Sequence, residues 1–277
     1  MQENKAPIGV FDSGYGGLTV LRALSEHLPE YDYLYLGDNA RAPYGTRSFE
    51  TVYQYTLEAV EWFFRQGCEL VILACNTASA KALRTIQQKD LPNMSPLKRV
   101  LGVIRPTAEV IGQLTDTQQI GILATPGTVN SESYLLEIHR FFPEVKVYQE
   151  SCPMWVPIVE NGEYNGNGAD YFIQKNIQHL LQQGPGIDTI LLACTHYPLL
   201  IPKIRQYTLP DIKIIDQGEI VAHSLIDYLK RHPEIDEKCA KNGQIAFYTT
   251  DSAADFDKNG AIFFGKPIKS RQIQLGH

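Results

Sequence analysis

The sequence contains two related half-chains, and this internal repeat limits the possible folds more than any other feature. Three segments of the first half return in the same order in the second half: residues 8–14 (IGVFDSG) as 120–128 (IGILATPGT), 70–78 (LVILACNTA) as 189–198 (TILLACTHYP), and 100–106 (VLGVIRP) as 212–218 (IKIIDQG). The second match aligns Cys75 with Cys194. Ordered matches of this kind indicate two halves with the same architecture.

Each repeated segment is a short apolar run that ends at Gly, Pro, Asn, Asp or Thr, which is typical of a buried parallel strand. Helical patterns lie between these runs. The clearest covers residues 48–67, with Ser48 as the candidate N-cap and Gly67 as the C-terminal stop. Further helices are expected at residues 18–27, 78–88, 131–142, 169–183, 202–207 and 219–231. Alternating strands and helices predict an α/β fold of two pseudo-symmetric three-layer domains with mostly parallel sheets.

Polar side chains gather where the predicted strands end, and ligands of parallel sheets bind at that edge. They are Asp12, Ser13, Asp38, Cys75, Asn76, Thr128, Cys194, Thr195 and His196. If the two halves face each other, Cys75 and Cys194 lie on opposite sides of one cleft. The sequence therefore places the active site in the cleft between the domains.

Cys75 and Cys194 each end an apolar strand and precede an expected helix start. The positive end of a helix lowers the pKa of a nearby thiol from about 8.5 towards neutrality. A single cysteine in this context is more often part of the core, but both copies of the repeat keep it. The other cysteines, Cys68, Cys152 and Cys239, lack this context and are expected to be structural.

Two acid/base groups on opposite faces of one carbon are what an inversion of configuration requires. A thiolate removes the proton from one face, and a thiol supplies a proton to the other. Acid/base catalysis alone gives about 10²–10⁴-fold, so preorganised donors must supply the rest of the rate enhancement. Candidate donors are Ser13, Asn76, Thr77, Thr128 and Thr195.

Composition excludes several classes of function. The chain has 25 Lys and Arg against 31 Asp and Glu, a net charge of -6, so nucleic acid is not expected as the main partner. No apolar run is long enough for a membrane helix and the first residues carry no signal core, which predicts a cytoplasmic protein with no membrane partner. Five cysteines without a CxxC pair indicate free thiols. The seven histidines form no recognised metal-binding motif, so no metal is expected.

Seven ordered blocks resemble the cofactor-independent glutamate racemases of bacteria. They are FDSGYGGL (11–18), GD (37–38), PYG (43–45), ACNTAS (74–79), LATPGTV (123–129), VPIVE (156–160) and CTHYPLL (194–200). The resemblance implies an isomerase that interconverts L- and D-glutamate without cofactor or metal and supplies D-glutamate for peptidoglycan. It also implies a homodimer. Some relatives respond to a cell-wall precursor and carry a longer N-terminal extension, and the short segment before the first expected strand favours an enzyme without this activator.

The resemblance assigns roles to individual residues. It implies that Cys75 deprotonates D-glutamate with the help of Asp12, and that Cys194 deprotonates L-glutamate with the help of Glu160 and His196. The implied substrate contacts are Asp12, Ser13, Tyr44, Gly45, Asn76, Thr77, Thr128, Thr195 and His196.

The resemblance further implies that the chain crosses between the domains twice. Residues 1–98 and 210–277 are expected to form the first α/β domain, and residues 99–209 the second. On this division the segment 100–106 begins the second domain, and its partner 212–218 re-enters the first.

Several alternatives remain at this point. An aspartate or broad-specificity aspartate/glutamate racemase would keep both cysteines, although the PYG and CTHYPLL blocks favour glutamate. A decarboxylase of the same superfamily would need only one of them. A nucleotide-binding module would use Gly14, Gly16 and Gly17 as a phosphate loop, but Thr19 stands where a dinucleotide fingerprint needs Gly or Ala. A redox sensor would pair Cys75 with Cys194, which a ligand-sized cleft would hold too far apart.

Overall fold

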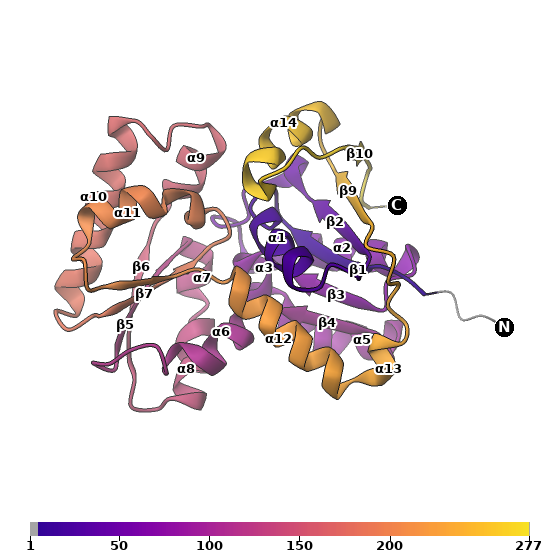
Figure 1. Ribbon diagram of the computed structural model, residues 1–277, viewed down its shortest axis with the longest axis horizontal. Coiled ribbons are helices and arrows are strands. Elements are labelled where there is room, and N and C mark those ends of the chain that lie inside the picture. Colours follow the sequence, from indigo (N-terminus) through magenta and orange to yellow (C-terminus); the bar gives the residue numbers. More distant parts are fainter. Residues whose placement is uncertain (1–4, 277) are drawn as a thin grey trace.

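The computed structural model describes residues 5–276 and has two lobes, each built on a parallel sheet (Figure 1). The first sheet has six strands in the order β10-β9-β2-β1-β3-β4, and the second has four in the order β6-β5-β7-β8. The strands of the first sheet are β1 (Ile8–Asp12), β2 (Tyr33–Gly37), β3 (Leu70–Leu73), β4 (Arg99–Gly102), β9 (Ile245–Thr249) and β10 (Ser270–Gln272). Those of the second are β5 (Gln119–Ala124), β6 (Lys146–Ser151), β7 (Thr189–Ala193) and β8 (Lys213–Ile215).

The sequence repeat corresponds to equivalent strands in the two sheets. The order β2-β1-β3-β4 in the first sheet matches the order β6-β5-β7-β8 in the second. The three repeated segments therefore contain β1 and β5, β3 and β7, and β4 and β8. The prediction of two related α/β halves with parallel sheets is confirmed, and β9 and β10 extend only the first half.

The chain passes between the sheets at places other than those predicted. β4 pairs with β3, so residues 99–102 belong to the first sheet, and β8 pairs with β7 in the second. The two similar segments at 100–106 and 212–218 each complete their own sheet as an edge strand instead of opening the next domain. We therefore propose domain boundaries within 103–118 and after residue 215. The C-terminal strands still return to the first lobe, beside the N-terminal ones (Figure 1).

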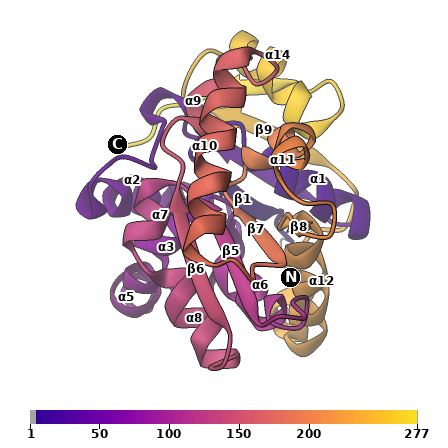
Figure 2. The ribbon, with the colours of Figure 1, turned by 90° about the vertical axis from the view of Figure 1, so that its left-hand side faces the viewer.

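Helices cover both faces of each sheet, which gives each lobe three layers. On the first sheet, α1 (Leu18–His27), α12 (Gly218–Arg231) and α14 (Ala253–Phe264) share one hydrophobic cluster, and α2 (Phe49–Arg65) belongs to a second cluster on the other face. On the second sheet, α10 (Asn167–Gln183) and α11 (Ile201–Tyr207) pack on one face, and α6 (Ile104–Ile111) and α8 (Ser133–Phe141) on the other (Figure 2). The shorter helices are η1 (Asn39–Arg41), α7 (Pro126–Asn130), α9 (Trp155–Glu160), η3 (Tyr197–Leu200) and α13 (Pro233–Asp236).

Local sequence signals explain most helix boundaries. The Ser48 side chain accepts a hydrogen bond from Thr51 N, which confirms Ser48 as the N-cap of α2. The single helix expected at residues 78–88 is instead a broken series: α3 (Asn76–Lys81), α4 (Leu83–Thr85), the π-helical turn η2 (Ile86–Asp90) and α5 (Leu91–Met94). Pro92 has no N–H with which to continue a regular α-helical pattern through this stretch. Within residues 5–276 no helix is long and apolar enough to cross a membrane.

Candidate active site

A cavity of about 180 Å³ lies where strands of both sheets end, and it is lined by residues from both lobes. Cys75 follows β3 of the first sheet, and Cys194 follows the equivalent strand β7 of the second. Both thiols line this cavity, so the structure brings together the two cysteines that the repeat aligns. The other predicted site residues that line it are Ser13, Tyr44, Gly45, Asn76, Thr77, Glu160, Thr195 and His196.

Cys75 is itself the N-cap of the short helix α3. Its Sγ accepts a hydrogen bond from Ala78 N at 3.5 Å and lies 3.6 Å from the Ser13 hydroxyl oxygen. The prediction that the pKa of this thiol is lowered towards neutrality is wrong, although the hydrogen bond from the helix start acts in that direction. Burial and the nearby Asp12 carboxyl raise the pKa of Cys75 to about 12, because together they outweigh the two hydrogen bonds. Cys75 is therefore a protonated thiol in the unliganded protein near neutral pH.

Cys194 has a different environment. The residues after it form the 3₁₀ helix η3 and then α11, so no α-helix begins at the thiol, contrary to the prediction. The nearest polar partner is the His196 imidazole, whose Nδ1 lies 4.0 Å from Cys194 Sγ. A side chain that can carry a positive charge thus replaces the expected helix end.

His196 lies between Cys194 and Glu160. Its Nε2 is 3.0 Å from Glu160 Oε1, and the imidazole is buried. Burial lowers the pKa of His196, but the hydrogen bonds to Cys194 and Glu160 and the charges of these two groups outweigh it and raise the pKa to about 10. The imidazole is therefore a cation near neutral pH, with one nitrogen directed at the carboxylate and the other at the thiol.

Asp12 lies behind the cavity wall and does not line it. Its carboxylate accepts hydrogen bonds from Gly14 N at 3.0 Å and from the Thr195 hydroxyl at 3.3 Å. Burial raises the pKa of Asp12, and the charge of His196 opposes this shift. Asp12 therefore joins the two half-sites, because it is the last residue of β1 in the first sheet and binds Thr195, the residue next to Cys194.

The glycines after β1 allow this close approach. A Cβ atom on Gly16 would lie 2.2 Å from Thr195 Oγ1 and 2.5 Å from His196 Nδ1, and one on Gly17 would lie 2.4 Å from Asp12 Cβ. Close packing against the Cys194 segment thus explains Gly16, close packing on Asp12 explains Gly17, and a phosphate loop is not needed to account for either.

Asn76 lines the cavity and has a buried side-chain nitrogen without a hydrogen-bond partner among the described residues. Its Oδ1 accepts a hydrogen bond from the Tyr134 hydroxyl at 2.5 Å, while its Nδ2 is buried without a partner among the described residues. The Tyr134 hydroxyl in turn accepts a hydrogen bond from Gln217 Nε2 at 2.6 Å. An unsatisfied buried donor is costly, so the amide is suited to an anionic ligand in the cavity.

The loop that carries Tyr44 and Gly45 belongs to the first lobe and forms a hydrogen bond with the second. The Tyr44 hydroxyl donates to Asp38, which also accepts from Arg41 Nε and from the Thr250 hydroxyl, each at 2.8 Å. The Gly45 carbonyl accepts a hydrogen bond from Gly127 N at 2.8 Å. Asp38 is thus a buried anchor of this loop and does not line the cavity.

Thr128, like Asp12, is a predicted substrate contact that does not line the cavity. It is fully buried behind Thr125, whose hydroxyl lies 3.1 Å from Thr128 Oγ1 and accepts from Thr128 N. Thr125 is the N-cap of α7 and lines the cavity; the Thr-Pro-Gly sequence was the signal for it. Lining residues that the sequence did not predict are Pro43, Thr46, Thr125, Pro126, Cys152, Pro153, Val156 and Pro157.

All five cysteines are free thiols, as predicted, and Cys152 is the third that lines the cavity. Burial and Glu150 raise the pKa of Cys152 well above its ordinary value. Among residues 5–276, no positively charged group is found to shift the pKa of Cys152, whereas His196 faces Cys194. Cys152 therefore remains predicted to be structural.

The chain is similar to proteins of known family. The family model described as Asp/Glu/Hydantoin racemase matches residues 15–225. The glutamate racemase of Enterococcus faecalis is 38% identical over 280 residues, covering 99% of this chain and 97% of that protein. A solved glutamate racemase isoform from Bacillus anthracis has a TM-score of 0.88 at 33% identity, with 98% of each chain covered. A glutamate racemase from Francisella tularensis in complex with D-glutamate has a TM-score of 0.86 at 30% identity, again with 98% of each chain covered.

Proposed function

The chain belongs to the Asp/Glu/Hydantoin racemase family, and we propose that it interconverts L-glutamate and D-glutamate by proton transfer between two thiols. The observation that carries this proposal is the pair Cys75 and Cys194. They follow equivalent strands of two related sheets and line one cavity. A substrate held between them presents opposite faces of its α-carbon to the two sulfur atoms.

In the L-to-D direction, the Cys194 thiolate removes the α-proton and becomes a thiol. The Cys75 thiol gives its proton to the opposite face of the carbanion and becomes a thiolate. The reverse reaction exchanges the two roles, so no electrons are gained or lost and no cofactor takes part. Each direct proton transfer contributes about 10²–10⁴-fold, and fixed hydrogen-bond donors must stabilise the carbanion for the remainder.

The charged groups beside Cys75 and Cys194 differ, so the two half-sites are prepared for different roles in proton transfer. The His196 cation faces Cys194, whereas Cys75 lies near the Asp12 carboxyl and has a pKa of about 12. The unliganded protein is therefore prepared for Cys75 to act as the acid, which is the L-to-D direction. For D-glutamate, the substrate's own ammonium group brings a positive charge into the cavity and favours ionisation of Cys75.

The neutral donors of the cavity are suited to the substrate carboxylates. Asn76 Nδ2 has no partner among the residues that the structure describes, and Ser13, Thr77 and Thr195, which carry hydroxyls, line the same cavity. Such groups bind anions without adding a full positive charge that would hold a thiolate permanently ionised. We propose Ser13, Asn76, Thr77 and Thr195 as the direct contacts, together with Tyr44, Gly45 and His196. Asp12 and Thr128 act through their neighbours, because they lie behind the cavity wall.

Three further parts of the proposal rest on the family alone. They are a cytoplasmic enzyme, a homodimer, and a supply of D-glutamate for peptidoglycan. Gel filtration with light scattering tests the second, and a dimer mass supports it.

An assay of four substrates tests the proposal. Protein treated with EDTA and dialysed free of small molecules is incubated separately with L- and D-glutamate and with L- and D-aspartate, and optical rotation is followed. Racemisation of both glutamate enantiomers and a much lower rate with aspartate is the expected result. Racemisation of aspartate alone, or of neither amino acid, would refute glutamate as the substrate.

A further inference from the structure

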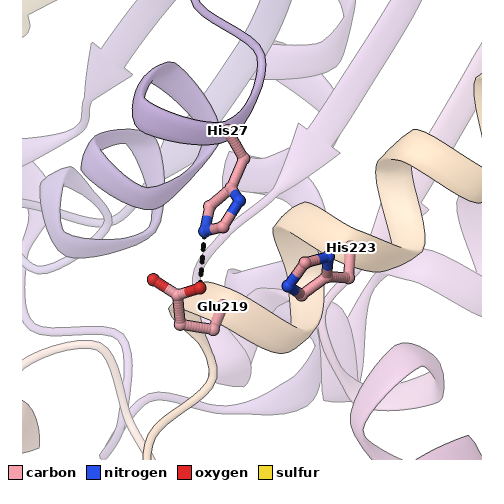
Figure 3. Close-up of side chains that lie close together, drawn as sticks. All are labelled: His27, Glu219 and His223. Atoms are coloured by element: carbon pink, nitrogen blue, oxygen red, sulfur yellow. Dashed lines mark hydrogen bonds and ion pairs between the residues drawn. The ribbon is translucent and has the colours of Figure 1, made fainter.

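Three potential metal ligands meet on the surface, outside the cavity that both thiols line. They are His27, the last residue of α1, and Glu219 and His223 of α12 (Figure 3). Their ligand atoms all lie within 4.8 Å of one another, and they form the one such group of three found among residues 5–276. None of them lines the cavity that holds Cys75 and Cys194.

The packing of two helices produces this cluster. Glu219 and His223 are four residues apart in α12, so they project from the same helix face. His27 reaches them from α1, which packs along α12. His27 Nε2 lies 2.5 Å from Glu219 Oε2, and the His27 and His223 rings have centroids 4.8 Å apart at 58°. His27 and Glu219 are 192 residues apart along the chain, which is why no sequence motif indicates the site.

We propose that His27, Glu219 and His223 bind a divalent transition-metal ion such as Zn²⁺ between α1 and α12. Two imidazoles and one carboxylate form a donor set that suits Zn²⁺, Co²⁺, Ni²⁺ and Cu²⁺, whereas Mg²⁺ and Ca²⁺ prefer oxygen ligands. Ligand bonds of about 2.0–2.2 Å in a tetrahedron place donor atoms about 3.3 Å apart. His27 Nε2 and Glu219 Oε2 are closer than this, at 2.5 Å, and all the ligand atoms lie within 4.8 Å, so side-chain rotations would bring them to this spacing.

The exposure of the side chains allows these rotations. The His27 side chain is 29% exposed and that of Glu219 is 61% exposed, and His223 is also exposed. Water can therefore fill the remaining coordination position. A simple ion pair between His27 and Glu219 accounts for two of these residues and leaves the placement of the His223 ring against His27 unexplained.

A bound ion would connect two helices that come, along the chain, after strands of different sheets. α1 follows β1 of the first sheet, and α12 follows β8 of the second. Glu219 also lines a second cavity, of about 90 Å³, whose wall includes Thr195 and Cys194. The ion would therefore hold α1 and α12 together at the outer side of the segment that carries Cys194, and stabilise the folded protein by mass action.

Isothermal titration calorimetry of the EDTA-treated full chain with ZnCl₂ tests this site. One equivalent of Zn²⁺ is expected to bind, with MgCl₂ giving no signal at the same concentration. His223→Gln and Glu219→Gln are each expected to weaken binding roughly tenfold or more. The matched control is His232→Gln, since His232 has a Glu234 partner at 3.2 Å but is not part of the three-residue group.

The absorption spectrum of bound Co²⁺ distinguishes metal binding at this site from metal binding by cysteine. Co²⁺ at the proposed site gives d–d bands without the intense sulfur-to-cobalt charge-transfer band in the near ultraviolet, and His27→Gln removes the d–d bands. Circular dichroism of each metal-free variant checks that it is folded. Three results would each overturn the proposal. The first is stoichiometric Zn²⁺ binding that persists in both His27→Gln and His223→Gln, the second is a cobalt–thiolate band, and the third is no binding of Zn²⁺ to the folded wild type.

Discussion

Glu160 Oε1 lies 3.0 Å from Nε2 of His196, and this contact directs the other imidazole nitrogen, Nδ1, towards Cys194 Sγ at 4.0 Å. The arrangement resembles a triad in which a carboxylate orients an imidazole beside a sulfur atom. Cys75 has no equivalent: its neighbours are the Ser13 hydroxyl and the Asp12 carboxyl. The two half-sites therefore share a fold and differ in charge, and this asymmetry can be measured.

Removing the imidazole should impair one direction of proton removal more than the other. His196→Asn is expected to lower kcat about 10²–10⁴-fold, the range of an acid/base contribution. Proton removal by Cys194 then becomes more rate-limiting, so the primary isotope effect on kcat/KM with α-deuterated L-glutamate increases. The effect with α-deuterated D-glutamate is expected to increase less. Equal changes for both enantiomers would contradict the assignment of His196 to Cys194.

The raised pKa of His196 predicts a dependence of stability on pH. The ordinary pKa is 6.5, and in the folded protein it is about 10. Between these values the folded state holds a proton that the unfolded state has released. The stabilisation is complete below about pH 6.5 and is lost as the pH rises through about 10. Denaturant unfolding at pH 6, 8 and 10 should show the free-energy gap between wild type and His196→Gln narrowing with pH; a gap that widens would contradict the prediction.

The different surroundings of the two thiols predict their order of alkylation. Cys75 and Cys194 are 5% and 6% exposed, so access does not distinguish them. Iodoacetamide reacts with the thiolate, and the pKa of Cys75 is about 12, while Cys194 faces the His196 cation. At pH 7, peptide mass spectrometry should find Cys194 modified first. Preferential modification of Cys75 would contradict the proposed resting state.

A methyl group on Gly16 should displace the second half-site. Its Cβ would meet Thr195 and His196 at 2.2 and 2.5 Å, and misplacement of catalytic groups by about 1 Å can cost about 100-fold in rate. Gly16→Ala is therefore expected to lose about 100-fold in kcat/KM. Gly168→Ala is the control, because nothing lies within 4 Å of a Cβ there, and it should leave activity unchanged. Full activity of Gly16→Ala would contradict the prediction, because it would show that Thr195 and His196 can shift without loss of activity.

Tyr134 is expected to position Asn76. Tyr134→Phe removes the hydroxyl that donates to Asn76 Oδ1, and leaving this buried acceptor unpaired costs about 1–3 kcal/mol of folding free energy, whereas Gln217 Nε2 keeps Val103 O and Thr107 Oγ1 as partners. Because the Asn76 amide is then free to rotate, KM for glutamate should increase more than kcat decreases. Tyr171→Phe, at an exposed tyrosine, provides the control. A loss of stability with unchanged KM would contradict this prediction and show that Tyr134 stabilises the fold without positioning Asn76 for substrate binding.

The sequence predicts the architecture better than the electrostatics of the site. The repeat identified equivalent strands, and Ser48 predicted the start of α2, because apolar periodicity and capping are local properties. The edge strands β4 and β8 were assigned to the wrong lobes, since pairing with β3 and β7 depends on contacts distant in sequence.

The direction of the pKa shift at Cys75 was also wrong, and for a similar reason. A helix start can be recognised from sequence, but full burial and the approach of Asp12 arise only when the lobe is assembled. The same holds for Thr128, which lies one layer behind Thr125, and for the cluster of His27 with α12. Side chains brought together by tertiary packing leave little trace in one sequence.

The most direct test of the two-thiol proposal is α-deuterium incorporation in D₂O, measured by NMR and chiral chromatography. Wild type should racemise both enantiomers with deuterium entering the product. Cys75→Ser should deuterate only L-glutamate and Cys194→Ser only D-glutamate, neither with measurable racemisation, while Cys152→Ala, at the third thiol of the cavity, behaves as wild type. Racemisation without solvent deuterium, or undiminished racemisation by either serine variant, would contradict the proposal.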